Sequence, residues 1–201
     1  MGSGCVVSVV SPVVTHPLGD LDALVRPAPA PSVTLTVRAR RPMAQVLARK
    51  GGDMDAALAM RTAPSRAHAG DGFVALPLAP GQWMLVGEPD VTPEDFAASI
   101  EGKVGEAAHV SQQSDARTSF RVSGPQARAL MARGCRLDLD RPNPGFCAQT
   151  PMAQVGVLLH EVEAADGRAF DLYVYNGFAR SFWHWLTQTA EQFDPEVTVE
   201  R

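Results

Sequence analysis

The chain repeats part of its own pattern, and this repeat limits the folds that it can adopt. Residues 33–51 read as a strand with alternating apolar side chains followed by a short helix, and residues 119–135 repeat that order. Pro42 and Pro125 stand at the start of the two helices, and Gly51 and Gly134 stand at the same offset at their ends. Proline is favoured in the first turn of a helix and glycine just beyond its end. The repeat therefore predicts two related lobes.

A second, weaker repeat follows each copy. Residues 82–100 and residues 169–186 each read as a strand followed by a helix. In the first of these segments Thr92 is expected to cap the helix, with Asp95 at the capping-box position. Further strands are expected at residues 73–76 and 83–86, joined by Pro80-Gly81, and at residues 155–159 and 170–175, joined by Asp166-Gly167.

Strands interleaved with helices in a duplicated order predict an α+β fold. We expect two pseudo-repeated lobes, each an antiparallel sheet with helices on one face. The expected organisation is an extended, Pro-rich N-terminal arm over residues 1–32, a first lobe over 33–110 and a second lobe over 111–201. The arm is apolar, and its prolines prevent a long regular element, so it must lie against either the body of this chain or another chain.

Composition excludes several classes of protein. The apolar fraction of 45% is ordinary for a globular protein, and a net charge of −4 without a basic stripe argues against nucleic-acid binding. No stretch approaches the ~20 apolar residues of a membrane span, and the N-terminus lacks the pattern of a signal peptide. The three cysteines suggest reduced thiols in a cytoplasmic protein. The arginines are scattered and are expected on solvated faces: Arg38, Arg40, Arg41, Arg128, Arg133, Arg136 and Arg141.

Motifs that carry chemistry are missing from the sequence. It has no nucleophile elbow and no phosphate-binding loop, and its histidines never stand at the spacing of a helical zinc site. His160 and Glu161 are neighbours, but in a strand their side chains point to opposite faces. We therefore predict no catalytic, cofactor-binding or metal-binding residue in this chain.

Aromatic residues gather in the last helix, expected at residues 179–193. Phe182, Leu186 and Phe193 fall on one face, and Trp183 and Trp185 lie at its two edges. Indoles at such edges either close the core or form a contact with another subunit, and the sequence leaves both alternatives open. The candidate subunit interface consists of Trp183, Trp185, Phe146, Val9 and Val13.

Three segments carry a resemblance to a known family. These are RTSFRVSGPQARALMARGCRLDL (117–139), FCAQTPMAQVGVLL (146–159) and FDLYVYNGFARSFWHWLTQTAEQF (170–193). They resemble the gamma subunit of bacterial heterotetrameric sarcosine oxidase, and the similarity extends back through LPLAPGQWMLVG (76–87). That subunit is itself similar to the folate-binding aminomethyltransferase, or T-protein, superfamily, which has a T-protein/folate-binding-domain-like fold of two related lobes.

The resemblance implies membership of a cytoplasmic complex with alpha, beta and delta subunits. Such complexes oxidise sarcosine or a related N-methyl amine to glycine, hydrogen peroxide and formaldehyde, or methylene-tetrahydrofolate. FAD, FMN, NAD, tetrahydrofolate and zinc are expected in the partner subunits and no cofactor in this chain.

One departure from the T-protein pattern bears on activity. Folate-dependent relatives carry an acidic doublet that positions the folate amine, and the corresponding position here is Leu159-His160. Neither residue can supply a carboxylate to a developing cation; Glu161 and Glu163 stand nearby and keep the question open, although the alignment does not favour them. The departure favours a non-catalytic subunit. A stand-alone folate-binding or aminomethyltransferase-like protein is the alternative, and a binding module of another assembly is a third possibility.

Overall fold

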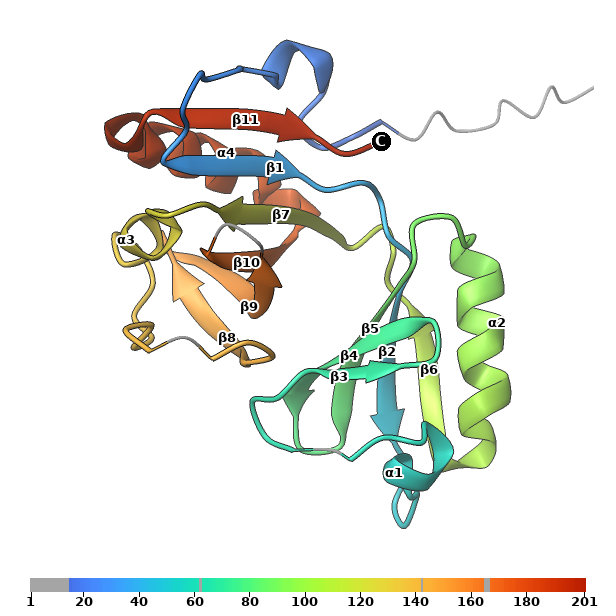
Figure 1. Cartoon of the computed structure of the whole chain (residues 1–201). Coiled ribbons are helices and arrows are strands. Elements are labelled where there is room, and N and C mark those ends of the chain that lie inside the picture. Colours follow the sequence, from blue (N-terminus) through green and yellow to red (C-terminus); the bar gives the residue numbers. More distant parts are fainter. Residues whose placement is uncertain (1–14, 62, 142, 165–166) are drawn as a thin grey trace, which may run out of the picture.

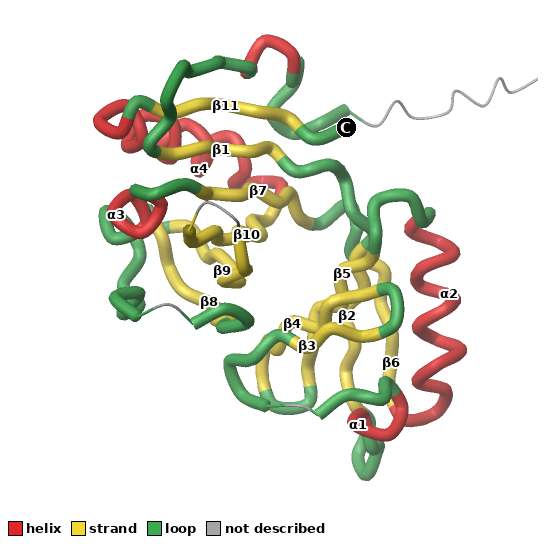
Figure 2. The backbone as a smooth tube through the Cα atoms, viewed as in Figure 1, coloured by secondary structure: helices red, strands yellow, loops and turns green. Residues whose placement is uncertain are grey.

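The computed structural model describes residues 15–61, 63–141, 143–164 and 167–201, and the chain forms two lobes that lie side by side (Figure 1). One lobe has a five-stranded antiparallel sheet. Its strands, in spatial order, are β3 (His68–Gly70), β4 (Phe73–Ala79), β5 (Gln82–Gly87), β2 (Met43–Ala48) and β6 (Ala108–Gln112). The short α1 (Met54–Ala57) and the longer α2 (Pro93–Val104) accompany this sheet, and α2 runs along β2 and β6 (Figure 2).

The other lobe has a six-stranded sheet. Its order is β11 (Pro195–Val199), β1 (Val33–Val37), β7 (Arg117–Ser123), β10 (Gly167–Tyr175), β9 (Val155–Ala164) and β8 (Cys147–Met152). Neighbouring strands are antiparallel except β1 and β11, which are parallel. α3 (Ala127–Met131) and α4 (Asn176–Ala190) contact this sheet, and single 3₁₀ turns lie at Asp22–Leu24, Gly105–Ala107 and Glu191–Phe193. The predicted α+β class with two lobes is confirmed.

The prediction of a helix after Pro42 is wrong, because this segment forms strand β2. β2 is an inner strand that pairs with β5 on one side and with β6 on the other. A helix would bury Met43, Val46 and Leu47 on one face, whereas Leu47 is 44% exposed. The helix predicted after Pro125 does form, as α3, but no side chain caps its N-terminus. Thus the two copies of the first repeat share a sequence pattern, but the segment after the proline forms a strand in one copy and a helix in the other.

Strand β1 belongs to a different lobe from the one predicted. It pairs with β7 and β11, and its buried Leu35 lies in the same core as Phe120 and Val122. The five-stranded sheet draws its strands from residues 43–112 alone. Two connections therefore cross between the lobes, residues 38–42 after β1 and residues 113–116 before β7 (Figure 1).

The predicted hairpins and the two longer helices are present. Gly81 adopts a positive φ of 74° in the β4–β5 turn, and the β9–β10 turn includes Asp166, which lies outside the described residues. Thr92 caps α2: its Oγ1 accepts a hydrogen bond from the Asp95 amide at 3.1 Å and donates one to the Asp95 carboxylate at 2.8 Å.

The described part of the N-terminal arm lies against the body of the chain. Leu18, Leu21 and Leu24 pack on the core of the six-stranded lobe, and Arg26 exchanges backbone hydrogen bonds with Val197 at 3.0 and 2.8 Å. Residues 1–14, which include Cys5 and the interface candidates Val9 and Val13, lie outside the described residues.

A separate apolar cluster joins the two lobes. Met43, Leu76, Met84 and Val86 from the five-stranded sheet contact Cys147, Leu158 and Tyr173 from the six-stranded sheet. Backbone hydrogen bonds add to this contact, since the amide of Cys147 donates to the carbonyl oxygen of Ser65 at 3.0 Å. Side chains therefore fill much of the space between the sheets.

The aromatic residues of α4 pack within the chain. Trp183 is 7% exposed and stacks on Phe120, with 5.2 Å between ring centroids. Trp185 is half-buried, 5.6 Å from Phe182, and covers Gly134 so closely that a Cβ atom there would overlap its ring. These contacts correspond to core closure, the first of the two alternatives.

Gly134→Ala should lower the free energy of unfolding by about 1–3 kcal/mol, because the added methyl group must displace Trp185. Gly177→Ala in the first turn of α4 is the matched control, since a Cβ atom there meets open space. Urea denaturation of both variants measures the difference. Equal stability of the two variants would contradict the packing of Trp185 on Gly134.

Candidate functional site

A buried carboxylate lies on the face of the six-stranded sheet that is turned toward the other lobe. Asp171 of β10 is 4% exposed. Arg38 donates to both of its carboxylate oxygens through Nη1 at 3.0 and 2.9 Å, and Arg121 does so through Nε and Nη2 at 2.7 and 2.8 Å. Arg38 also donates from Nε to Glu200 at 2.7 Å. Two guanidinium groups thus hold one carboxylate.

These ion pairs set the charge of the cluster. Burial alone would raise the pKa of Asp171, but the hydrogen bonds and positive charges of Arg121 and Arg38 outweigh it and hold this pKa below its ordinary value. Burial alone would lower the pKa of Arg38, but Asp171 and Glu200 outweigh this effect and hold the pKa above its ordinary value. The prediction that Arg38 faces solvent is wrong, because Arg38 is 9% exposed.

His160 lies beside this cluster. It stands opposite Asp171 in the β9–β10 pair and opposite Cys147 in the β8–β9 pair, so the three side chains share one face. His160 is 8% exposed, and burial lowers its pKa although Asp171 opposes this effect. Burial raises the pKa of the Cys147 thiol to about 12. Of these three side chains, the imidazole of His160 is therefore neutral and the thiol of Cys147 protonated at neutral pH. This combination does not favour nucleophilic catalysis.

The position of the missing acidic doublet, Leu159-His160, carries no carboxylate. Leu159 is buried in the core of the six-stranded lobe, and Leu158 belongs to the cluster between the lobes. Glu161 is 1% exposed and is bound by Arg168, whose Nε donates to Oε1 at 2.9 Å; the amide of Asn143 also donates to this oxygen. Asp171 and Glu161 are thus both engaged by arginine. The residues present do not fit the charge partner that the folate amine requires.

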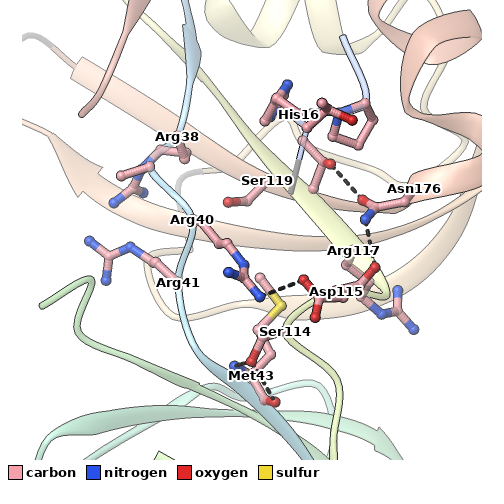
Figure 3. A pocket seen from close by; sticks show the side chains of 14 residues that line it. His16, Arg38, Arg40, Arg41, Met43, Ser114, Asp115, Arg117, Ser119 and Asn176 are labelled. Carbon is pink, nitrogen blue, oxygen red and sulfur yellow. Dashed lines mark hydrogen bonds and ion pairs between the residues drawn. The ribbon is translucent and has the colours of Figure 1, made fainter. Parts of the chain in front are cut away.

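Two cavities open between the lobes. One, of about 540 Å³, lies between the β4–β5 hairpin and the start of β8. Its lining includes one thiol, that of Cys147, and no charged side chain. The lining residues are Ala63, Pro64, Ser65, Pro77, Leu78, Ala79, Pro80, Gly81, Trp83, Cys147, Ala148 and Gln149. The other, of about 320 Å³, lies at the two connections between the lobes, and we call it the crossing cavity. Its walls carry four arginines, Arg38, Arg40, Arg41 and Arg117, and one carboxylate, Asp115 (Figure 3).

No protein-family model matches the chain, and no curated protein sequence matches it. Solved structures do match. A chain of the heterotetrameric sarcosine oxidase from Corynebacterium sp. U-96 superposes with a TM-score of 0.71 and 24% identity, over 87% of this chain and 91% of that chain. Aminomethyltransferase T of the glycine cleavage system from Bartonella henselae superposes with a TM-score of 0.63 and 19% identity, over 92% of this chain and 52% of that one.

The chain has a T-protein-like fold. The resemblance found in residues 117–193 predicted this fold, and the prediction is confirmed. The present chain spans about half the length of the aminomethyltransferase.

The structure shows no metal-binding cluster in the part of the chain that it describes. No group of three or more His, Cys, Asp or Glu side chains is placed to bind a metal ion within residues 15–61, 63–141, 143–164 and 167–201. In the same residues, no helix has the length and apolar character that crossing a membrane requires.

The candidate interface residues within the described part of the chain differ in how far their side chains are exposed. Trp183 is buried, so little of its surface can meet another chain, whereas Trp185 and Phe146 are half-buried. The aromatic side chains with most exposed surface are Phe178, at 55%, and Tyr175, at 48%. Neither residue was among the predicted interface residues, because the last helix was expected to begin at residue 179, after both of them.

The buried ion cluster was also missed. Asp171 stands inside the apolar run Phe170–Tyr175, and a charged residue in a strand whose neighbours are all apolar is the one signal that could have marked it. Its partners could not be read from the sequence, since Arg38 is 133 residues away along the chain.

Asp171→Asn should lower the free energy of unfolding by about 3–5 kcal/mol, because it leaves buried Arg38 facing a neutral group. Asp140→Asn is the matched control: it removes an exposed ion pair with Arg128 and should cost less than about 1 kcal/mol. Urea denaturation at pH 7 measures both changes. A loss for Asp171→Asn as small as that for Asp140→Asn would show that the cluster is not stabilising.

Stability should fall as the pH drops below 6.5. The pKa of His160 in the folded chain is lower than its ordinary value of 6.5, so the unfolded chain takes up a proton first and is favoured. Burial also lowers the pKa of His16, which adds to the slope. Unfolding free energies of His160→Gln between pH 7.5 and pH 5 should show a smaller slope with pH than those of the original chain. Equal slopes in the variant and the original chain would exclude a neutral, buried His160.

Proposed function

We propose that this chain is a non-catalytic subunit, of the gamma type, in a complex similar to heterotetrameric sarcosine oxidase. The observation that carries the proposal is the state of the inner sheet face. The carboxylate buried there, that of Asp171, is held by two arginines, and apolar side chains fill the adjoining space. A T-protein-like fold with this inner face would supply shape and surface to the complex.

The assembled complex would oxidise sarcosine or a related N-methyl amine in the cytoplasm. By this proposal the alpha, beta and delta subunits carry the flavins, NAD, tetrahydrofolate and zinc. The likeness in fold to a chain of a heterotetrameric sarcosine oxidase, with a TM-score of 0.71 over 87% of this chain, supports the proposal.

The alternative, a stand-alone folate-binding protein, has weaker support. It needs a carboxylate free to pair with the folate amine, and Glu161 and Asp171 are both bound to arginine. Calorimetric titration of the isolated chain with tetrahydrofolate separates the two functions. Saturable binding would favour the alternative, and its absence would favour the subunit.

The proposed subunit interface centres on one side of α4. Phe178 lies two turns before Trp185 on the same side of the helix, so the two residues can form a continuous apolar contact. Because Phe178 is more than half exposed in the chain alone, burying it against a partner would stabilise association with no cost to the fold. Phe146 and the exposed edge of Trp185 remain part of the proposed surface.

The chain should co-purify from its native cells with a large yellow flavoprotein. Phe178→Ser should weaken this association while changing the unfolding free energy of the isolated chain by less than about 0.5 kcal/mol. Val91→Ser, on the other lobe, is the control and should assemble normally. Size-exclusion chromatography with detection at flavin wavelengths measures assembly. A colourless, monomeric native protein would refute the proposed function, and normal assembly of Phe178→Ser would refute only the interface.

A further inference from the structure

β6 is an edge strand, and part of its backbone has no partner strand. It pairs with β2 on one side, and within the described residues no strand lies on its other side (Figure 2). The amide of Gln113 donates to the carbonyl oxygen of Met43 at 2.7 Å, which fixes the residues that face β2. In an antiparallel pair, backbone groups point toward the partner strand at every second residue. The residues whose N–H and C=O groups face away from β2 are therefore Ala108, Val110 and Gln112.

The other three sheet edges are protected in ways that β6 is not. β8 contains Pro151, and the amide of Cys147 donates to a neighbouring loop. β11 begins with Pro195, and Arg26 exchanges two backbone hydrogen bonds with Val197. β3 has three residues. β6 contains no proline and no Asp, Glu, Lys or Arg, and among the described residues no backbone hydrogen bond crosses its outer edge. Proteins protect their edge strands against pairing with other chains, so an unprotected edge indicates a place where another strand pairs.

One flank of α2 lies on the side of this open edge. The apolar face of α2 packs on the core of the five-stranded lobe. The ammonium group of Lys103 lies 5.5 Å from the ring centroid of Phe73 in β4, so the flank with Lys103 points across the sheet and away from β6. At 3.6 residues per turn, Glu101 is about 200° and Glu94 about 180° from Lys103 around the helix. These two glutamates therefore lie on the opposite flank, toward the outer edge of β6.

The two glutamates carry negative charge that has no partner in the described part of the chain. Both are exposed, and neither forms an ion pair with a described residue. They stand seven residues apart, which is about 10 Å along the helix axis. That distance is close to the length of about three residues in a strand. Open backbone groups and two spaced negative charges thus lie along the same edge.

We propose that an extended, basic segment of another subunit pairs with β6 and becomes the sixth strand of this sheet. Its backbone exchanges hydrogen bonds with Val110 and Gln112, which is the recognition mode of β-strand addition. Lys or Arg side chains two or four positions apart on its α2 side pair with Glu94 and Glu101. The inference rests on the proposed function, because the segment belongs to a partner in the complex.

A second copy of this chain fits the edge less well. Antiparallel pairing of two β6 strands around Val110 would place the two α2 helices on the same face of the joint sheet. The flanks that carry Glu94 and Glu101 would then face each other, and their like charges would repel. A basic segment meets the same edge with charge of the opposite sign. Charge complementarity therefore favours a basic partner over a second copy.

Hydrogen–deuterium exchange tests the added strand in the native complex. Mass spectrometry with fragmentation to single residues measures the exchange of each amide. The amides of Val110 and Gln112 should exchange at least roughly 10-fold more slowly in the complex than in the isolated chain, since the added strand bonds to one side of both residues. The amides of His109 and Ser111 bond to β2 in both states and are the internal control. Unchanged exchange at Val110 and Gln112, or equal slowing at all four amides, would overturn the proposal.

Gln112→Pro tests the same edge by mutation. Proline removes the outward N–H and keeps the hydrogen bonds to β2, so the chain should fold and bind its partners roughly 10-fold more weakly. Gln112→Ala keeps the N–H and should assemble normally. Size-exclusion chromatography over a dilution series, with detection at flavin wavelengths, measures the affinity, and thermal unfolding checks the fold. Equal assembly of two folded variants contradicts the added strand; if Gln112→Pro does not fold, the charge variants decide.

The charge variants test the chemistry of the partner. Glu94→Gln and Glu101→Gln should each weaken assembly roughly 2- to 5-fold at low salt, and the difference should shrink in about 0.5 M salt. Ser99→Lys is the matched control: it also changes the net charge by one unit, but exposed Ser99 lies about 200° from Glu101 on α2. It should leave the affinity unchanged. Equal affinities of all three variants would exclude a basic partner.

The outcomes separate this inference from the proposed function. A native chain without partner subunits would overturn both. A normal flavoprotein complex in which the outward amides of β6 exchange as freely as in the isolated chain would overturn the inference alone. A dimer of the isolated chain that Gln112→Pro dissociates would show that a second copy, and not a basic segment, occupies the edge.

Discussion

The pairing of Asp171 with Arg38 and Arg121 is the interaction on which the six-stranded lobe depends. It joins three adjacent strands, since Arg38 follows β1, Arg121 lies in β7 and Asp171 lies in β10. Through Glu200 it also holds the chain just after β11. A carboxylate this deeply buried is stable only when its partners are in place, so the cluster acts on several segments together. It thereby fixes the point at which the chain leaves β1 and crosses to the other lobe.

The same pairing decides what the inner sheet face can do. A carboxylate held by two guanidinium groups keeps its charge and has no affinity left for a substrate cation, and the neighbouring His160 is held neutral by burial. Leu158, Tyr173 and Met84 then fill the space where the two sheets meet. The T-protein-like fold thus has two lobes whose inner face is stabilised by ion pairs and apolar contacts.

Local signals predicted the elements that depend on local contacts. The cap of Thr92 on Asp95 and the turn at Gly81 need only neighbouring residues, and both were found where the sequence placed them. β2 was misassigned because Met43, Val46 and Leu47 suit a helix as well as a strand, and pairing with both β5 and β6 decided between them. The membership of β1, the burial of Arg38 and the exposure of Phe178 all follow from contacts between distant segments, which no local pattern records.

The connections between the lobes carry charged side chains that tie the chain to both lobes. Arg38 turns toward the six-stranded sheet, whereas Arg41, three residues later, reaches Gly87 and Glu88 of the five-stranded lobe. Arg117 begins β7 directly after the second crossing. The first crossing is thus held to one lobe by Arg38 and to the other by Arg41, and these contacts hold the two lobes in their observed arrangement.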